Sequence, residues 1–278
     1  MTQTPSTRST PSIWRALAID LDGTLLIGED LPPEHRRAVA EAHAAGLEII
    51  IATARWRQMA QRIASEIGID KPIIACSGAQ LFVPEGHDIF DHRLPPPFVE
   101  ALYALCNEER CIATITLQDH VVLKLDGRPD PSMIPEEMEW VPALDPGVHA
   151  LPRIGAIQGS GAVRRIREEL EPAFADQVNI YDSVGPNGKL VLTITAKAAS
   201  KGEALLAGCR HLGLDPGEVI AFGDAENDIE MFKVAGASVA MGQADERIRS
   251  AATIVTGSNT EDGVAAVIDR LLATGDIR

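Results

Sequence analysis

Short apolar runs alternate along this chain with longer stretches in which apolar positions recur at helical spacing. The runs predict strands, the most apolar of them buried on both faces of a sheet, at residues 16–19, 47–53, 73–76, 219–222, 237–240 and 254–255. The longer stretches predict helices at residues 32–45, 58–67, 201–212, 227–234, 245–252 and 262–273. Strands that alternate with helices predict an α/β fold with a doubly wound, mostly parallel sheet.

The pattern changes after Gln80, where two short apolar runs flank Pro84-Glu85-Gly86 and predict a hairpin. Beyond it the composition differs, with proline clusters at residues 95–97 and 129–135. In this part we expect helices at residues 98–107 and 162–170 and strands at residues 111–117, 121–125, 153–158, 179–183 and 190–195. These elements predict a separate α/β domain of ordinary size.

The chain is therefore expected to divide into three parts. Residues 13–90 and 195–278 form a core, and residues 91–194 form an α/β domain inserted into it. Residues 1–12 are rich in Thr, Ser and Pro and contain no acid, which predicts a disordered extension. A short transit peptide is the alternative, but the segment has two prolines and no amphipathic stripe.

Acidic residues follow two of the predicted strands. Asp20 and Asp22 come after the run at 16–19 and precede Gly23-Thr24, and Asp224 comes after the run at 219–222. Taken alone, the first pair is also compatible with a simple Asp-Gly turn. Ligands of open parallel sheets bind at the carboxyl edge, and two acid-ended strands that meet there favour a divalent cation.

These acidic segments resemble the motifs of a known family. Asp20-Leu21-Asp22-Gly23-Thr24 and Gly223-Asp224-Ala225-Glu226-Asn227-Asp228 resemble the first and last signature motifs of the haloacid dehalogenase superfamily of phosphohydrolases. Between them, Thr53-Ala54-Arg55 is similar to its strand-end threonine motif and Ser200-Lys201-Gly202 to its lysine motif. Cys76-Ser77-Gly78-Ala79 and Val239 to Ala244 resemble the Cof-like group. The resemblance implies a Rossmann-like core with an inserted type-IIB α/β cap domain.

The resemblance also implies catalytic roles. Asp20 would attack phosphorus and form an aspartyl-phosphate, while Asp22 would protonate the leaving alkoxide and later deprotonate the hydrolytic water. Thr53 and Lys201 would bind the phosphate, and Arg55 would be a third cation that reaches toward the cap. Taken alone, Asp22 is also explained as a turn cap, Thr53 as a strand end and Lys201 as a solvated helix residue.

The ligands of Mg²⁺, the expected cofactor, follow in the same way. They would be the side chains of Asp20 and Asp224 and the backbone oxygen of Asp22. Asn227 and Asp228 would orient a metal-bound water or a ligand, and Asn227 would also contact substrate. The same Asp-Asn-Asp cluster is a helix N-cap by composition, and both roles are compatible.

The chain departs from the family pattern at three positions in loops around the substrate. Ala54 replaces a usual glycine, and Ser77 and Gln243 replace usual asparagines. Substrate choice would belong to the cap, which closes over the site and excludes water. Four cap cations are candidates for a polar substrate, although a solvated surface position is the default for each of Lys124, Arg128, Arg153 and Lys189.

Composition limits the possible partners. The formal net charge of −15 and the pI of about 4.9 argue against nucleic acid and anionic membranes, so an anionic substrate needs a metal and a few placed cations. No apolar run is long enough to span a membrane. The four cysteines have neither metal-site spacing nor disulfide density, which favours reduced thiols in a cytoplasmic protein. For the oligomeric state we expect either a monomer or a homodimer.

The sequence thus predicts a Mg²⁺-dependent phosphomonoesterase that acts on a small phosphorylated metabolite, with sugar and polyol phosphates favoured. A phosphomutase would use the same aspartyl-phosphate but return the phosphoryl group to another hydroxyl. A non-catalytic sugar-phosphate sensor is a third possibility, disfavoured because a binder does not need the paired strand-end acids. Carbon–halogen hydrolysis is disfavoured because it needs no Mg²⁺, whereas the metal-binding acids are all present.

Overall fold

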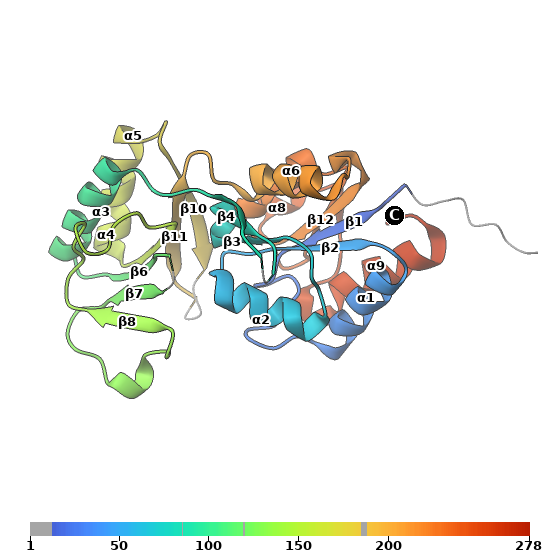
Figure 1. Cartoon of the computed structure of the whole chain (residues 1–278), viewed down its shortest axis with the longest axis horizontal. Helices are drawn as coiled ribbons and strands as arrows, with labels where there is room; N and C mark the ends of the chain where they lie inside the picture. Colours follow the sequence, from blue (N-terminus) through green and yellow to red (C-terminus); the bar gives the residue numbers. More distant parts are fainter. Residues whose placement is uncertain (1–12, 85, 119, 185–187) are drawn as a thin grey trace, which may run out of the picture.

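The computed structural model describes residues 13–278 except residues 85, 119 and 185–187. The extension predicted for residues 1–12 lies outside the described residues, as do the central residues of the turns expected around Glu85 and Asp119. The described elements form two sheets that lie on either side of the molecule in Figure 1.

The larger sheet has eight strands in the order β14-β13-β12-β1-β2-β3-β4-β5. Its strands are β1 (Ala16–Ile19), β2 (Glu48–Ala52), β3 (Ile73–Ala75), β4 (Gln80–Phe82), β5 (Asp88–Asp91), β12 (Val219–Gly223), β13 (Ala237–Ala240) and β14 (Ile254–Val255). Neighbouring strands from β14 to β3 are parallel, and β4 and β5 are antiparallel. The predicted α/β class is confirmed, and β4 and β5 form the predicted hairpin.

Helices cover both faces of this sheet (Figure 1). One face carries α1 (Pro33–Ala44), α2 (Arg57–Ile67) and α9 (Gly263–Thr274), and the other carries α6 (Lys201–Leu212), α7 (Ile229–Val234) and α8 (Glu246–Ala251). The alternation within β1 explains this: Leu17 and Ile19 pack with α1 and α9, whereas Ala16 and Ala18 pack with α6 and α7. Both faces of the strand are therefore buried, as its unbroken apolar sequence predicts.

The second sheet, which we call the cap sheet, has six strands in the order β10-β11-β9-β6-β7-β8. Its strands are β6 (Ile112–Thr116), β7 (Val121–Lys124), β8 (Met138–Val141), β9 (Ile154–Gln158), β10 (Val178–Val184) and β11 (Leu190–Ala196). All pairs are antiparallel except β7 with β8. Its helices are α3 (Pro96–Glu108), α4 (Ser160–Arg165), a π turn (Ile166–Leu170) and α5 (Glu171–Ala173). These helices and the cap sheet enclose a hydrophobic cluster that is separate from those of the larger sheet.

Some local predictions differ from the structure, among them the helix expected at 227–234, whose first two residues belong to a 3₁₀ turn. The strand β8 was not predicted, because its apolar positions lie within a proline-rich and charged segment. The predicted strand 73–76 ends one residue early, since Cys76 begins a 3₁₀ turn with a positive φ. The helix expected at 162–170 is longer and contains the π turn.

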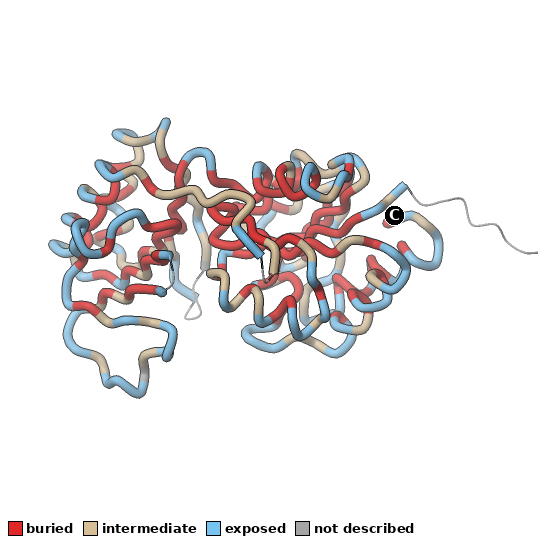
Figure 2. Tube along the Cα trace, in the orientation of Figure 1, coloured by how far each residue is buried: buried red, intermediate tan, exposed pale blue. Residues whose placement is uncertain are grey.

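Burial follows the two sheets (Figure 2), and all four cysteines are buried free thiols. In the described part of the chain, no helix combines the length and the apolarity that a membrane crossing requires.

Candidate active site

The two acid-ended strands meet at one edge of the larger sheet. β1 and β12 are hydrogen-bonded parallel neighbours in which Ile19 lies opposite Phe222, so Asp20 and Asp224 leave the sheet on the same side. Asp228 follows on the 3₁₀ turn Glu226–Asp228. Asp20, Asp224 and Asp228 each offer a carboxylate oxygen, and these three oxygens lie within 4.8 Å of one another.

Lys201 joins two of these acids. It is the first residue of α6, behind the N-cap Ser200, and its side chain is 1% exposed. Its Nζ donates to Oδ1 of Asp20 at 2.6 Å and to Oδ1 of Asp228 at 2.6 Å. A buried ammonium held between two carboxylates stays charged, because both acids raise the pKa of Lys201 and together outweigh the opposing effect of burial.

The loop after β12 is fixed from within. Oδ2 of Asp228 accepts hydrogen bonds from the backbone N–H groups of Asp224 and Ala225, both at 3.0 Å. Oδ1 of Asp224 accepts from the Thr24 hydroxyl at 3.2 Å. Gln243, one of the positions that departs from the family pattern, donates to the backbone oxygen of Gly23 beside Asp224. The carboxylate of Asp224 is therefore oriented before any ligand binds.

The electrostatics of the cluster favour a cation. Burial raises the pKa of Asp20 well above its usual value despite the opposing charge of Lys201, and Asp228 and Asp224 raise it further. Burial is the main cause that raises the pKa of Asp224 to about 7, and the charge of Asp228 adds to it. Three buried or half-buried acids share one lysine, and all the donor atoms of the cluster are oxygens. These residues fit a hard divalent metal ion.

The side chain of Asp22 lies outside this cluster. It is 51% exposed and accepts from Nη2 of Arg55 at 2.6 Å and from Nε at 3.0 and 3.1 Å. Nη1 of the same arginine donates to Glu29 at 2.7 Å. Arg55 therefore contacts two acids of the core. It does not reach toward the cap as expected. Glu29 was missed because nothing in its sequence context distinguishes it from a surface acid.

Thr53 and Asn227 lie buried around a third strand end. Thr53 follows β2, and its hydroxyl accepts from the backbone N–H of Arg55 at 3.1 Å. Nδ2 of Asn227 donates to the hydroxyl of Ser77 at 3.1 Å. Oδ1 of Asn227 is buried and has no hydrogen-bond partner within the described chain. This oxygen is available to a bound water or ligand, and Ser77 orients it where the family pattern has an amide side chain.

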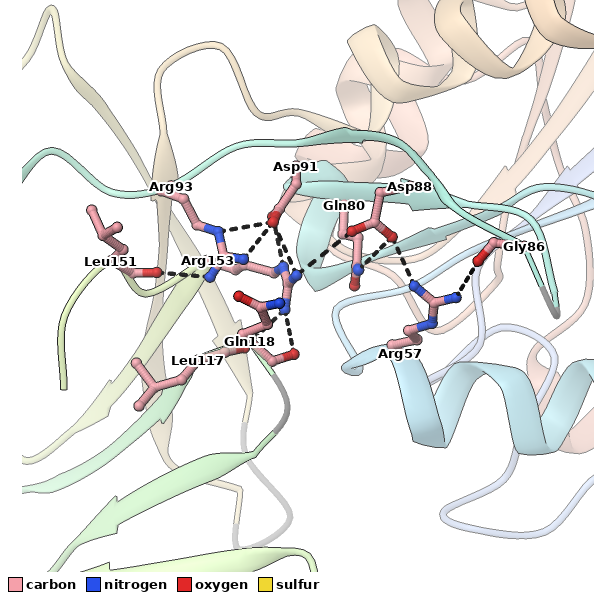
Figure 3. Close-up of polar contacts among 10 residues, drawn as sticks. All are labelled: Arg57, Gln80, Gly86, Asp88, Asp91, Arg93, Leu117, Gln118, Leu151 and Arg153. Atoms are coloured by element: carbon pink, nitrogen blue, oxygen red, sulfur yellow. Dashed lines mark hydrogen bonds and ion pairs between the residues drawn. The ribbon is translucent and has the colours of Figure 1, made fainter.

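Two of the four cap cations have structural roles. Arg153 is 2% exposed, and it bonds Asp91 at 2.6 and 3.0 Å and the backbone oxygens of Leu117 and Gln118 (Figure 3). Lys124 is buried and bonds Asp126 at 3.0 Å. The default of a solvated surface position is wrong for both residues. Arg128 and Lys189 are exposed.

Comparison with known proteins agrees with this geometry. The family model described as haloacid dehalogenase-like hydrolase matches residues 17–268. The pyridoxal phosphate phosphatase YbhA of Escherichia coli is 30% identical, over 91% of this chain and 97% of its own length. The 5-amino-6-(5-phospho-D-ribitylamino)uracil phosphatase YwtE of Bacillus subtilis is 28% identical, over 93% and 98%. The structure of the subclass IIB sugar phosphatase BT4131 superposes with a TM-score of 0.79 at 25% identity, covering 92% of this chain and 98% of that one.

Proposed function

Because this chain belongs to the haloacid dehalogenase-like hydrolases and is a phosphatase, we propose that it hydrolyses small phosphomonoesters with Mg²⁺ and through an aspartyl-phosphate on Asp20. The observation that carries this proposal is the buried cluster in which Lys201 bridges Asp20 and Asp228 beside Asp224. A lysine that holds a strand-end carboxylate in one orientation leaves the second oxygen of that carboxylate free to attack.

In the first step, an oxygen of Asp20 forms a bond to phosphorus while the bond to the leaving oxygen breaks. The developing alkoxide takes a proton from Asp22, which first has to leave Arg55 and turn toward the substrate. In the second step Asp22 removes a proton from water, the water oxygen attacks phosphorus, and the carboxylate of Asp20 is released with inorganic phosphate. We assign the binding of the phosphoryl group to Thr53 and Lys201, both buried, and the unpaired oxygen of Asn227 would accept from its attacking water.

The metal would be held by side-chain oxygens of Asp20 and Asp224 and by the backbone oxygen of Asp22, with Asp228 orienting the loop. When bound, Mg²⁺ supplies positive charge that neutralises the phosphate oxygens. The raised pKa values of Asp20 and Asp224 support this assignment, because a cation at the cluster would offset the burial and the repulsion between acids that raise them.

For the substrate we propose a phosphorylated sugar or polyol. Support comes from the names of the relatives, one a sugar phosphatase and another a phosphatase of a ribityl phosphate. Because one relative at 30% identity is a pyridoxal phosphate phosphatase, pyridoxal phosphate is the first alternative substrate to compare with the sugar and polyol phosphates.

The test is a panel of phosphorylated metabolites assayed for phosphate release with Mg²⁺, with EDTA, and with Mg²⁺ restored. We expect release that EDTA stops and Mg²⁺ restores, and Asp20→Asn should lower it by at least about 10³-fold at nearly unchanged side-chain volume. The phosphorylated Asp20 should be detectable by mass spectrometry during turnover. Parent-like turnover in Asp20→Asn would contradict the nucleophile, and binding of sugar phosphates without release under any metal would favour a sensor.

A further inference from the structure

The turn that carries the acidic cluster also contacts the cap. Glu226 lies between Asp224 and Asp228, and its side chain is 19% exposed. Its Oε2 accepts a hydrogen bond from the backbone N–H of Asp182, on β10 of the cap sheet, at 2.7 Å. Its Oε1 pairs with Nη2 of Arg247, on α8 of the core, at 2.6 Å. One carboxylate thus joins the core, the acidic turn and the cap.

The cap's donor in this contact is an edge N–H group. β10 is the first strand of the cap sheet, with β11 as its single neighbour in the described sheet. Because the N–H of Asp182 donates to Glu226, it faces away from β11, where an edge strand otherwise leaves its donors to water. A hydrogen bond to a carboxylate is charge-assisted and stronger than a neutral one. The contact therefore satisfies a donor that the cap sheet itself does not satisfy.

The other cap contacts differ in kind. Arg153 binds Asp91 at the first connection between core and cap (Figure 3), and Nδ2 of Asn179 binds backbone oxygens of Ala196, Lys197 and Ala199 at the second. Both lie on the connecting segments, where a change in cap orientation moves atoms least. Arg62 and Glu137, at 4.0 Å, are both about half exposed, so that pair contributes little. The contact of Glu226 lies away from the connections, at the acids themselves.

A displacement of Glu226 would reach both neighbouring acids. The turn has three residues, and Oδ2 of Asp228 closes it by accepting from Asp224 and Ala225. We propose that Glu226 is a positioning residue that couples the orientation of the cap to the geometry of Asp224 and Asp228. With the cap in place, Asp182 and Arg247 hold Glu226 and the turn keeps its shape; with the cap displaced, one of these two supports is lost.

This inference rests on the proposed function in one respect, the assignment of Asp224 to the metal. Linkage then gives it a direct consequence: if the cap contact favours metal binding by some factor, metal binding favours the cap contact by the same factor. Mg²⁺ alone, without substrate, should therefore slow hydrogen exchange at the Asp182 amide in the parent protein.

Two pairs of variants isolate the contact. Asp182→Pro removes the donor, which an edge strand tolerates because this N–H makes no ladder bond, whereas Asp182→Ala keeps the donor and removes only the side-chain pair with Arg167. Glu226→Ala removes the acceptor. Its control, Glu230→Ala, removes a carboxylate one turn later that pairs with Lys233 at 2.6 Å. Circular dichroism checks the fold of each variant.

Calorimetry with Mg²⁺ alone is the deciding measurement. We expect Asp182→Pro and Glu226→Ala to bind Mg²⁺ about fivefold or more weakly than the parent, a typical coupling between sites, and both controls to stay within about twofold. A purely structural contact would lower thermal stability without moving this affinity. Parent-like affinity in Glu226→Ala, or equal affinity in Asp182→Pro and Asp182→Ala, would overturn the proposal.

Two further readouts keep the test decisive. Where Asp182→Pro or Glu226→Ala does not fold, Glu226→Gln, which keeps the shape and loses the charge, is measured instead, and its Asp182 amide should respond less to Mg²⁺ than the amide of the parent. A parent amide that does not respond to Mg²⁺ would also overturn the coupling. None of these readouts needs turnover, so a chain that binds Mg²⁺ but releases no phosphate would contradict the proposed function and leave the coupling to be judged separately.

Discussion

At the residue scale, the site is a group of acids with too few cations. Lys201 bonds Asp20 and Asp228 directly, whereas within the described residues the oxygens of Asp224 accept from neutral donors, the hydroxyl of Thr24 and the amide of Gln243. Burial and the charge of Asp228 disfavour ionisation of Asp224 and outweigh the opposing charge of Lys201, so the pKa of Asp224 rises to about 7. Without a metal, the fully ionised cluster is therefore energetically unfavourable. A bound cation would stabilise this ionised form.

The charge of Asp224 predicts how the stability of the metal-free protein depends on pH. Between its usual pKa and about 7, folded Asp224 keeps a proton that the unfolded chain has released, so the unfolded state binds fewer protons. The free energy of unfolding should then fall as the pH rises through this window, by up to about 1.4 kcal/mol per pH unit. Urea unfolding in EDTA from pH 5 to pH 7.5 measures the slope.

The matched control is Asp224→Asn, which keeps the volume and removes the titrating group. We expect its unfolding free energy to fall less steeply over the same window. Mg²⁺ binds the ionised acid, so its stabilising effect on the parent should increase with pH up to about 7 and then level off. Equal slopes in parent and variant would show that Asp224 is not the group responsible.

The sequence could place some of these residues and not others. Asp20 and Asp224 were found because an acid directly after an apolar strand has a defined place at the sheet edge, and pairing of β1 with β12 brings them together. The side-chain direction of Asp22 could not be found, because it depends on a competition between the substrate site and Arg55, which Glu29 also holds. The sequence does not distinguish Glu226 from the other residues of its motif, because its partner is a backbone N–H of a distant strand.

At the element scale, one turn contacts the loop after β2, the side chain of Asn227 and the start of α6. The 3₁₀ turn Cys76–Gly78 follows β3 and has positive φ angles of 51° at Cys76, 53° at Ser77 and 91° at Gly78. Such angles are strained for residues other than glycine, and strain of this kind persists where surrounding contacts compensate for it. Here the contacts are hydrogen bonds from the N–H groups of Cys76 and Ser77 to the backbone oxygens of Arg55 and Thr53.

Gly78 brings this turn against the start of α6. A Cβ at Gly78 would lie 2.2 Å from the carbonyl carbon of Ser200 and 2.6 Å from the nitrogen of Lys201. We predict that Gly78→Ala lowers the free energy of unfolding by about 3 kcal/mol, from backbone strain and overpacking together. It should also lower kcat by at least about tenfold, because Lys201 has to shift. Chemical unfolding and steady-state kinetics on the best substrate of the panel measure both effects.

Gly46 is the matched control for this prediction. Its φ of 95° is close to that of Gly78, but a Cβ there would meet nothing within 4 Å. Gly46→Ala should therefore lose only the conformational contribution, about 1 kcal/mol, with kcat unchanged. If both variants lost the same stability and activity, the close approach of Gly78 to α6 would not be what positions Lys201.

Elements with a strong pattern were predictable, and elements held by their surroundings were not. The central strands of the larger sheet are continuous apolar runs and were found near their observed limits. The strand β8 has only a few apolar positions and forms because β7 offers a parallel edge to it. The 3₁₀ turn after β3 was assigned to the strand at Cys76, because its conformation depends on the backbone of the loop after β2 and on α6.

At the scale of the whole molecule, the cap is a body with its own hydrophobic cluster. That cluster contains side chains from residues 94–194, whereas the clusters on the two faces of the larger sheet draw mainly on the core, with Ile154 and Ala196 at the boundary. The acids and the lysine of the candidate site all belong to the core. This separation predicts that the chemistry and the choice of substrate can be exchanged independently.

We therefore predict that replacing residues 94–194 by the cap of a related phosphatase changes the ranking of kcat/KM across a panel of phosphate esters, while Asp20 remains the phosphorylated residue. The replacement should keep a partner for Asp91 in place of Arg153 and an edge N–H that reaches Glu226, because both contacts orient the cap. Rates should fall in part, since closure also excludes water. A chimera that folds and keeps the parent ranking would locate selectivity in the core loops, with Ser77 and Gln243 as the first residues to exchange.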